Sequence, residues 1–136
     1  MVIDHAQSAF IKGRQIRDNI LLAQDLMHDY HKPGGIPHVA AKVDIMKAYD
    51  SVRWDFLMDL LSVPGFPPKM QGWIRACVTS TRYSINFNGE PIGYFAGARG
   101  IRQGDPMSPY LFVLVMDTLS QIITSNIQHA PQFKYH

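Results

Sequence analysis

The sequence has little cysteine and no long apolar segment. Cys77 is the only cysteine among 136 residues, so no disulfide forms within the chain and a reducing compartment is expected. No run of 18 apolar residues occurs, and the first residues lack the basic and apolar regions of a signal peptide. These absences predict an intracellular protein, cytoplasmic or nuclear, with no membrane partner.

Paired carboxylates are also missing. No two acidic residues are adjacent anywhere in the chain, and Asp117 is the only one after Pro106. The net charge of +2 is compatible with nucleic acid but is too small to indicate it alone. The six histidines show no metal-ligand spacing, so they predict no metal site.

Apolar patterns predict four helices. The first begins at Asp18, as N-cap, and ends before the Pro- and Gly-rich residues 32–37. The second covers about residues 52–61, with Ser51 as its N-cap. The fourth, at about residues 106–125, is almost apolar all round in its first half and should be buried. The third carries one apolar stripe, in which Cys77 is a packed thiol: Met70, Trp73, Ile74, Cys77 and Val78.

Strand patterns accompany these helices. Residues 39–44 predict a short buried strand. Residues 83–87 alternate between apolar and polar side chains, which predicts a strand with one buried face. Asn88-Gly89 is a favoured two-residue hairpin turn, and residues 92–95 supply the returning strand. The expected fold class is therefore α+β, with a small antiparallel sheet packed by helices.

The segment at residues 42–50 ends its expected strand at a carboxylate and then presents an aromatic ring. Asp44 at the carboxyl end of a buried strand is well placed to bind a metal, since hard cations prefer carboxylate oxygens. Tyr49 can stack under an incoming sugar and exclude a 2′-hydroxyl. The alternatives are that Asp44 caps the turn, that Tyr49 packs in the core, and that Asp50 caps the next helix or forms an ion pair.

A glycine-flanked loop at residues 100–106 precedes the fourth helix. Its backbone N–H groups, the Arg102 guanidinium and the Gln103 amide suit an anion or a base edge near a helix N-terminus. Gly104 allows the backbone to approach a ligand closely. The alternative is a helix-entry loop with Asp105 as the N-cap. Arg14 and Arg17 can contact phosphates, although lone arginines are commonly solvated.

Together these segments resemble the reverse transcriptase of non-LTR retrotransposons, the long interspersed element type, especially its plant branch. The string VDIMKAYD at residues 43–50 matches the first palm motif of that family. The string RGIRQGDPMSPYLF at residues 99–112 matches the second palm motif almost position for position. QSAFIKGRQIRDNI at residues 7–20 is similar to the fingers segment, and WDFL, GFP and GWI follow the first palm motif in the family's order.

The resemblance implies a partial right-hand polymerase and roles for individual residues. The metal ligands are Asp44 and the Ile45 carbonyl, and the metal is Mg²⁺. Tyr49 takes the sugar-gate position, and Gln103 and Gly104 line the incoming deoxynucleoside triphosphate. The partners are an RNA template and a DNA primer, and the oligomeric state is left open. The arginines that contact nucleic acid are Arg14, Arg17 and Arg102.

The chain departs from the family's pattern in one important respect. The family's aromatic-Ala-Asp-Asp turn, which completes both metal sites, has no counterpart among residues 1–136. We therefore expect a fragment with a fingers remnant at residues 1–37 and a palm portion at residues 38–136. Two hypotheses follow: a truncated RNA-directed DNA polymerase that is inactive alone, or a non-catalytic retroelement relic that binds nucleic acid or a protein partner, or is inert.

Overall fold

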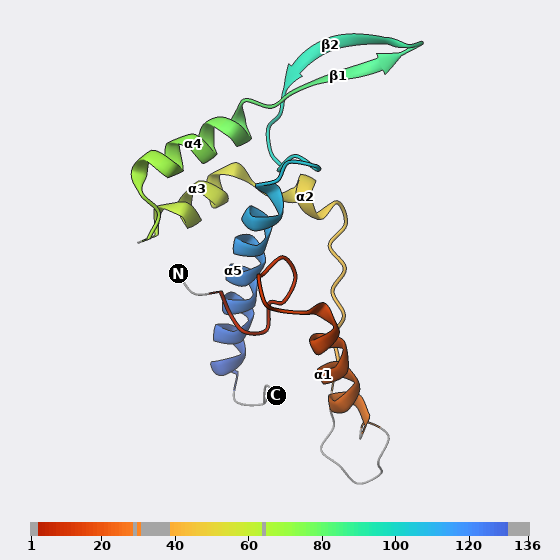
Figure 1. Cartoon of the computed structure of the whole chain (residues 1–136), viewed down its shortest axis with the longest axis vertical. Coiled ribbons are helices and arrows are strands. Elements are labelled where there is room, and N and C mark those ends of the chain that lie inside the picture. Colours follow the sequence, from red (N-terminus) through yellow and green to blue (C-terminus); the bar gives the residue numbers. More distant parts are fainter. Residues whose placement is uncertain (1–2, 29, 31–38, 64, 131–136) are drawn as a thin grey trace.

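The computed structural model describes residues 3–28, 30, 39–63 and 65–130 of the chain. The described elements are mixed helices and one two-stranded antiparallel sheet, which confirms the expected α+β class. Figure 1 shows them in chain order: α1 (Ile16–His28), α2 (Ala48–Ser51), α3 (Trp54–Ser62), α4 (Pro68–Thr79), β1 (Arg82–Phe87), β2 (Glu90–Ala96) and α5 (Ser108–Gln128).

The core lies where α3, α4 and the first half of α5 meet. Leu57 and Leu61 recur on one face of α3 and are fully buried. Removing a buried leucine side chain costs about 2–5 kcal/mol, so truncation of either residue should strongly destabilise the core. Figure 1 shows α3 and α4 on one side of α5 and α1 on the other. The buried cluster contains Val52, Leu57, Leu61, Ile74, Val78, Ile101 and Leu111.

The helix after the first palm motif begins later than predicted. Residues 48–51 form the single turn α2, and α3 starts at Trp54 with Arg53 as its N-cap. The prediction that Ser51 caps this helix is wrong, because the Ser51 hydroxyl donates to the Ala48 carbonyl within α2 at 2.8 Å. The string PGFP at residues 64–67 predicts the end of this helix, and α3 does end before it, at Ser62; Pro64 itself lies outside the described residues.

Only part of the apolar stripe on α4 is buried. Ile74 and Val78 face α3, whereas Met70, Trp73 and Cys77 are exposed. The prediction of a packed Cys77 thiol is therefore wrong. The described contacts of α4 are mainly with α3, and one partner helix covers only a narrow strip.

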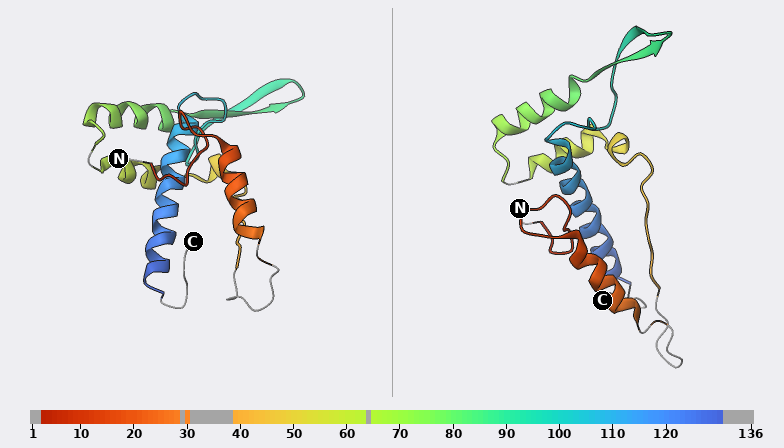
Figure 2. Two further views of the ribbon diagram at one scale, coloured as in Figure 1. Left: turned by 60° about the horizontal axis from the view of Figure 1, so that its bottom comes forward. Right: turned by 45° about the vertical axis from the view of Figure 1, so that its right-hand side comes forward.

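The hairpin forms as predicted, but neither of its faces is covered. Asn88 and Gly89 both have positive φ, as their two-residue turn requires. Tyr83 pairs with Phe95 and Ile85 with Ile92, with an irregularity between the two pairs. Every residue of β1 and β2 is exposed, so the predicted buried face is wrong. Figure 2 shows the reason: the ribbon projects away from the helices.

The predicted buried strand at residues 39–44 is also wrong. These residues form no strand, and the side chains of Val39 and Val43 are 86% and 76% exposed. A strand exists only through hydrogen bonds to a neighbour. The two described strands pair with each other and leave residues 39–44 without such a neighbour.

The N-terminal residues are tied to the far end of the chain. The loop at residues 3–15 precedes α1, which begins two residues before the predicted cap Asp18 and buries none of its residues. The backbone N–H of Asp4 donates to Asp117 Oδ1 on α5 at 2.8 Å. The Arg14 guanidinium closes the loop by donating to the carbonyls of Asp4, Gln7 and Ile3. The predicted terminator of α1, residues 32–37, lies outside the described residues.

The long helix α5 confirms the prediction of a helix after Pro106, with Pro109 in its first turn. By length and composition alone α5 can cross a membrane, since it has 21 residues and a mean hydropathy of 1.3. One such helix is weak evidence, because core helices have the same properties. Leu111, Val113 and Asp117 are buried on α5, whereas Tyr110 is exposed and only 17% of the apolar window is buried. The prediction that the first half of this helix is buried is therefore confirmed only in part.

Candidate nucleotide site

The turn that carries Tyr49 packs directly on α5. Lys47 adopts a left-handed conformation with φ 51°, which redirects the extended chain into α2. The ring of Tyr49 lies 4.9 Å from the ring of Phe112, centroid to centroid, at an interplanar angle of 53°. Tyr49 is half-buried. It is therefore part of the core and still has surface available to a ligand.

Three hydrogen bonds fasten the glycine-flanked loop to the Tyr49 turn and to the residues that follow it up to the start of α3, and we call them the clamp. The backbone N–H of Gly100 donates to the Val52 carbonyl at 2.7 Å, and that of Ile101 donates to the Tyr49 carbonyl at 3.0 Å. The indole N–H of Trp54 donates to the Gly100 carbonyl at 2.7 Å. One of these bonds, from Ile101 to Tyr49, joins the two segments that matched palm motifs, although these lie far apart in the sequence.

Gly100 fits the clamp because it has no side chain. Its φ is +91°, a left-handed conformation that L side chains rarely adopt. A Cβ atom at this position would lie 3.1 Å from the Asp50 Cα and 3.3 Å from the Asp50 carbonyl oxygen. Both the backbone conformation and the close approach of Asp50 therefore favour glycine.

Beyond the clamp the loop opens to solvent. Ile101 is buried in the core, whereas Arg102 and Gln103 are exposed. Nothing lies within 4 Å of the Cβ position of Gly104, so its backbone faces open space. This arrangement presents a guanidinium, an amide and a bare backbone segment just before α5. These are groups that bind anions and base edges.

Asp105 has a local structural role. Its Oδ1 accepts the backbone N–H of Met107 at 2.8 Å, and its carbonyl accepts that of Ser108 at 3.1 Å. Met107 is the N-cap of α5, so the alternative that Asp105 itself is the N-cap is wrong by two residues. Its side chain nevertheless satisfies a backbone donor at the helix entrance, as that alternative supposed.

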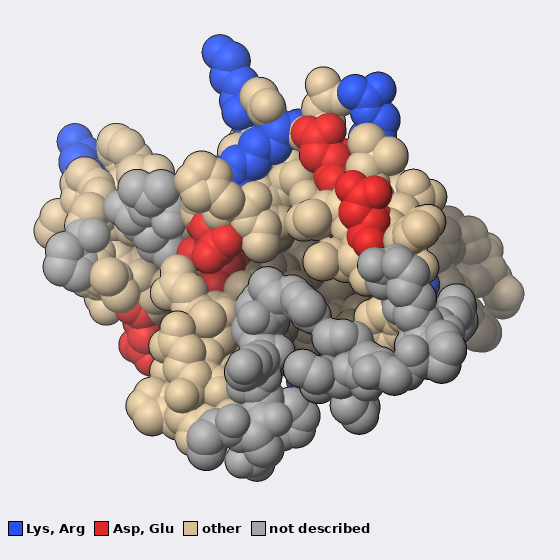
Figure 3. Space-filling model, turned by 90° about the horizontal axis from the view of Figure 1, so that it is seen from below, with Lys and Arg blue, Asp and Glu red and all other residues tan. Residues whose placement is uncertain are grey.

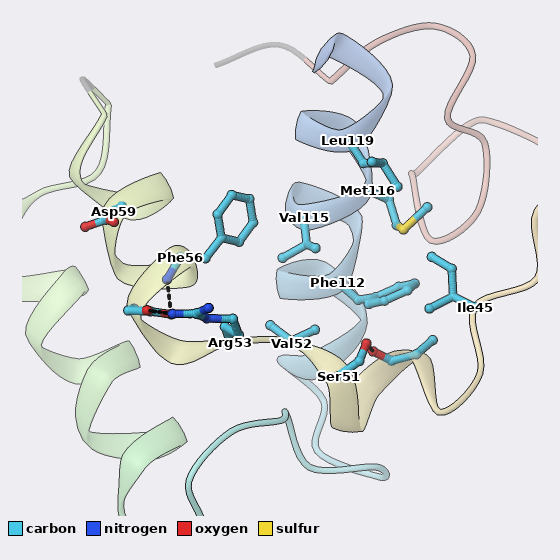
Figure 4. Close-up of a pocket in the computed structure, with 12 residues that line it drawn as sticks. Ile45, Ser51, Val52, Arg53, Phe56, Asp59, Phe112, Val115, Met116 and Leu119 are labelled. Atoms are coloured by element: carbon cyan, nitrogen blue, oxygen red, sulfur yellow. Dashed lines mark hydrogen bonds and ion pairs between the residues drawn. The ribbon is translucent and has the colours of Figure 1, made fainter. Parts of the chain in front are cut away.

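Asp44 and Ile45 lie on the extended segment before α2. Asp44 is exposed, and Ile45 is half-buried. Ile45 lines a pocket of about 440 Å³ with Phe112 and Met116 of α5, while Arg53 and Asp59 contribute polar groups (Figure 4). Phe112 therefore borders this pocket and also contacts the Tyr49 ring.

The described residues do not by themselves fit a magnesium site. No group of three or more His, Cys, Asp or Glu side chains gathers anywhere in the described parts of the chain. Mg²⁺ is usually bound through one or two carboxylates together with waters and substrate phosphates. Asp44 and the Ile45 carbonyl offer one carboxylate and one neutral oxygen. Their assignment as metal ligands stays a prediction.

The predicted nucleic-acid contacts differ in their surroundings. Arg14 already donates to three backbone carbonyls, so its guanidinium holds the N-terminal loop. Arg17, in the first turn of α1, and Arg102 are exposed. In the view of Figure 3, Lys and Arg do not merge into one basic surface, and acidic side chains lie between them. The roles of all three arginines stay predictions.

One ion pair stands beside the clamp. Arg53 and Asp55 pair through their side chains at the start of α3, where both are exposed. The hydrogen bond from Arg53 is the main cause that lowers the pKa of Asp55 to about 2 from its ordinary value of 3.8. The backbone N–H of Phe56 acts in the same direction. The pair thus keeps Asp55 ionised at the edge of the pocket.

Sequence reasoning did not identify Trp54 or Phe112 as parts of this site. Trp54 belongs to the string WDFL, where its position at the start of a helix gives no sign that its indole bonds Gly100. Phe112 lies in an apolar helix and looks like any core residue. Only the packing of α5 on α2 shows that it supports Tyr49.

The sequence of this chain is similar to those of known proteins. The family described as "Reverse transcriptase (RNA-dependent DNA polymerase)" matches residues 1–134. A "Retrovirus-related Pol polyprotein from type-2 retrotransposable element R2DM" of Drosophila melanogaster is 32% identical over 124 residues, which are 91% of this chain and 12% of that protein. A "Transposon TX1 uncharacterized 149 kDa protein" of Xenopus laevis is 31% identical over 85% of this chain and 9% of its own length.

A third relative, the "Retrovirus-related Pol polyprotein from type-1 retrotransposable element R2" of Nasonia vitripennis, is 29% identical over 92% of this chain and 12% of its own length. The chain therefore spans about a tenth of the length of the relatives it matches. The resemblance to non-LTR retrotransposon enzymes is confirmed, while the plant-like character stays a prediction. With a family match over almost its whole length, this chain belongs to the reverse transcriptase family.

Proposed function

We propose that this chain is the nucleotide-binding part of an RNA-directed DNA polymerase that copies retrotransposon RNA into DNA. The clamp is the single observation that carries the proposal. It ties Ile101 to Tyr49 by one hydrogen bond and the neighbouring Gly100 to Val52 and Trp54 by two more. A polymerase needs such fixed geometry, since phosphoryl transfer depends mainly on alignment and electrostatic stabilisation.

In this proposal the incoming deoxynucleoside triphosphate lies against the open side of the loop. Gln103 and the Gly104 backbone contact it, and Arg102 lies near the template or the base. Tyr49 presents its ring edge to the sugar and excludes a 2′-hydroxyl. The support is that Arg102, Gln103 and Gly104 are exposed while the neighbouring Ile101 is buried, so the loop is anchored on one side only.

The proposal assigns only some of the ligands that a magnesium site needs. Asp44 and the Ile45 carbonyl are the proposed ligands, and bound Mg²⁺ would neutralise phosphate charge. One carboxylate is too few to hold two such cations, and no cluster of three potential ligands exists in the described residues. We therefore propose that the chain alone binds nucleotide but does not polymerise.

The proposed domain assignment is a fingers remnant at residues 1–37 and a palm portion at residues 38–136. Template and primer binding is assigned to Arg17, Arg102 and Arg14. This binding should be salt-sensitive, because contacts to the nucleic-acid backbone release counterions.

Localisation is proposed to be intracellular, cytoplasmic or nuclear, with no membrane partner. The alternative, a relic that binds nucleic acid or a protein partner or is inert, is favoured by the lack of a described three-ligand cluster.

The test combines primer extension with nucleotide binding. The purified chain is given an RNA template, a DNA primer and Mg²⁺ or Mn²⁺, beside the variant Asp44→Asn. In parallel, calorimetry measures deoxynucleoside triphosphate binding to the wild type and to Gln103→Ala, with the exposed Gln24→Ala on α1 as a matched control.

We expect no extension, and nucleotide binding that Gln103→Ala weakens while Gln24→Ala does not. Extension that is lost in Asp44→Asn would contradict the proposed inactivity and would show that a further carboxylate is recruited. A folded chain that binds no nucleotide would contradict the proposed nucleotide site and favour the relic.

A further inference from the structure

Trp54 touches both ends of a short segment that leads from the hairpin into the loop. Its indole N–H donates to the Gly100 carbonyl at 2.7 Å. The six-membered ring, on the side that adjoins this N–H, approaches Gly97, where a Cβ atom would lie 3.3 Å from Cη2 and 3.4 Å from Cζ2. Both ends of residues 97–100 therefore lie near the edge of the indole that carries its N–H, with a glycine at each end.

Tyr83 completes this contact from the hairpin side. A Cβ atom on Gly97 would lie 3.0 Å from Cε2 of Tyr83, so any side chain at this position would meet both aromatic rings. The Gly97 N–H also donates to the Thr81 carbonyl at 3.1 Å. The loop is thus held where it leaves β2 and again where it turns into residues 101–104.

The helix that carries Trp54 is anchored in the core by its buried side chains. Trp54 is the first residue of α3, and Leu57 and Leu61 of the same helix are fully buried in the core. An indole on such a helix start has little freedom to move. Through its bond to Gly100 the indole connects the core to the loop, whose outer residues Arg102 and Gln103 lie at the surface.

We propose that Trp54 is a positioning residue for the nucleotide-binding loop. Its N–H holds the Gly100 carbonyl, and so fixes residues 101–104 relative to the Tyr49 turn. This inference rests on the proposed nucleotide site for its functional consequence, but its structural consequence stands alone. Loss of the N–H loosens Gly100 and Ile101 first, and nucleotide affinity falls with it.

Two variants separate the hydrogen bond from the packing. Trp54→Phe removes the N–H and part of the ring. Replacement of Trp54 by β-(3-benzothienyl)alanine exchanges the N–H for sulfur and keeps the ring size, so packing on Gly97 is retained. Trp73→Phe is the matched control, because Trp73 is exposed on α4 and makes none of the three hydrogen bonds of the clamp.

The decisive measurement is amide hydrogen exchange, residue by residue, in the whole 136-residue chain. In the wild type the amides of Gly100 and Ile101 are protected by their bonds to Val52 and Tyr49. Both Trp54 variants should speed exchange at these two amides about fivefold or more, as expected for the loss of one hydrogen bond. Exchange in the buried part of α5 should change less than about twofold in the benzothienyl variant.

Unchanged exchange at Gly100 and Ile101 in the benzothienyl variant would overturn the inference. So would an equal acceleration throughout the chain, which indicates a loss of global stability alone. Trp73→Phe should leave both loop amides as in the wild type.

Calorimetric titration with a deoxynucleoside triphosphate tests the functional consequence of the inference, which is that Trp54 supports nucleotide binding. Affinity should fall about fivefold in both Trp54 variants and not in Trp73→Phe. Equal affinities in the wild type and the benzothienyl variant would overturn the inference. If the wild type binds no nucleotide, the proposed function fails, and the exchange rates still decide whether Trp54 positions the loop.

Discussion

Asp117, in the middle of α5, accepts a hydrogen bond from the backbone N–H of Asp4 at 2.8 Å and so joins residues 113 positions apart. Its second carboxylate oxygen accepts from the Gln121 side chain at 2.7 Å. Asp117 is only 1% exposed, which makes it one of the most deeply buried side chains described. A buried carboxylate is tolerated when both oxygens are hydrogen-bonded, and here the bonds also dock the N-terminal loop on α5.

Asp117→Ala should therefore release the N-terminal loop. The change leaves the Asp4 N–H and the Gln121 amide without their acceptor, which costs about 1–3 kcal/mol in the free energy of unfolding. Limited proteolysis should cut residues 3–15 faster than in the wild type. Asp59→Ala, at an exposed carboxylate on α3, is the control and should behave like the wild type. Equal cleavage of the two variants would contradict the docking role of Asp117.

Gly100→Ala should destabilise the chain more than Gly104→Ala. Both glycines have positive φ, at +91° and +86°, so both changes strain the backbone. Only at Gly100 would the new Cβ meet other atoms, namely those of Asp50. We expect Gly104→Ala to cost about 1 kcal/mol and Gly100→Ala to cost more than that.

The urea midpoints of the two glycine variants provide the measurement. Because the backbone strain is similar, their difference reports the close approach of Gly100 to Asp50. Equal midpoints would mean that the Tyr49 turn moves away at no cost, and that the clamp is looser than its hydrogen bonds indicate.

The sequence predicted those elements whose formation depends on neighbouring residues. Asn88-Gly89 specified the turn of the hairpin, and the apolar run after Pro106 specified α5. Local rules decide both features, since turn geometry and helix periodicity act over a few residues.

The sequence failed where a partner elsewhere in the chain decides the outcome. Residues 39–44 have a strand's composition, but the described strands pair only with each other. Cys77 lies on an apolar stripe, yet the packing of α4 on α3 leaves it exposed. For the same reason the sequence did not predict the role of Trp54, because the acceptor of its indole N–H, the Gly100 carbonyl, lies 46 residues away.

The Arg53–Asp55 pair predicts a pH dependence with a definite sign. The pKa of Asp55 in the folded chain is about 2, below its ordinary value of 3.8, because Arg53 donates to the ionised form. A lowered pKa contributes stability that is fully present above pH 3.8 and is lost as the pH falls toward 2. Both side chains are exposed, so the contribution to stability is small.

Arg53→Gln should raise the pKa of Asp55 toward 3.8. An NMR titration that follows the Asp55 carboxyl carbon between pH 2 and 5 measures the change directly. Arg75→Gln, on α4, is the control and should leave the Asp55 titration where it is in the wild type. An Asp55 midpoint that does not respond to Arg53→Gln would show that the ion pair does not persist in solution.

Phe112 should stabilise the Tyr49 turn through the contact between the two rings. Phe112→Leu keeps an apolar side chain but removes the aromatic pair, which is worth about 0.5–1.5 kcal/mol beyond the area it buries. Tyr110→Leu, at an exposed position two residues earlier on α5, should change the free energy of unfolding by less than about 0.5 kcal/mol.

A double-mutant cycle between Phe112→Leu and Tyr49→Leu isolates this contact. The coupling free energy from urea unfolding should lie at about 0.5–1.5 kcal/mol, because the ring centroids are 4.9 Å apart. A coupling near zero would mean that Tyr49 is held by its backbone alone, through the bond from Ile101. In that case the Tyr49 ring could rotate freely, and it would not form the fixed steric barrier that the proposed exclusion of a 2′-hydroxyl requires. A measurable coupling instead makes Phe112 the support that keeps the Tyr49 ring in place.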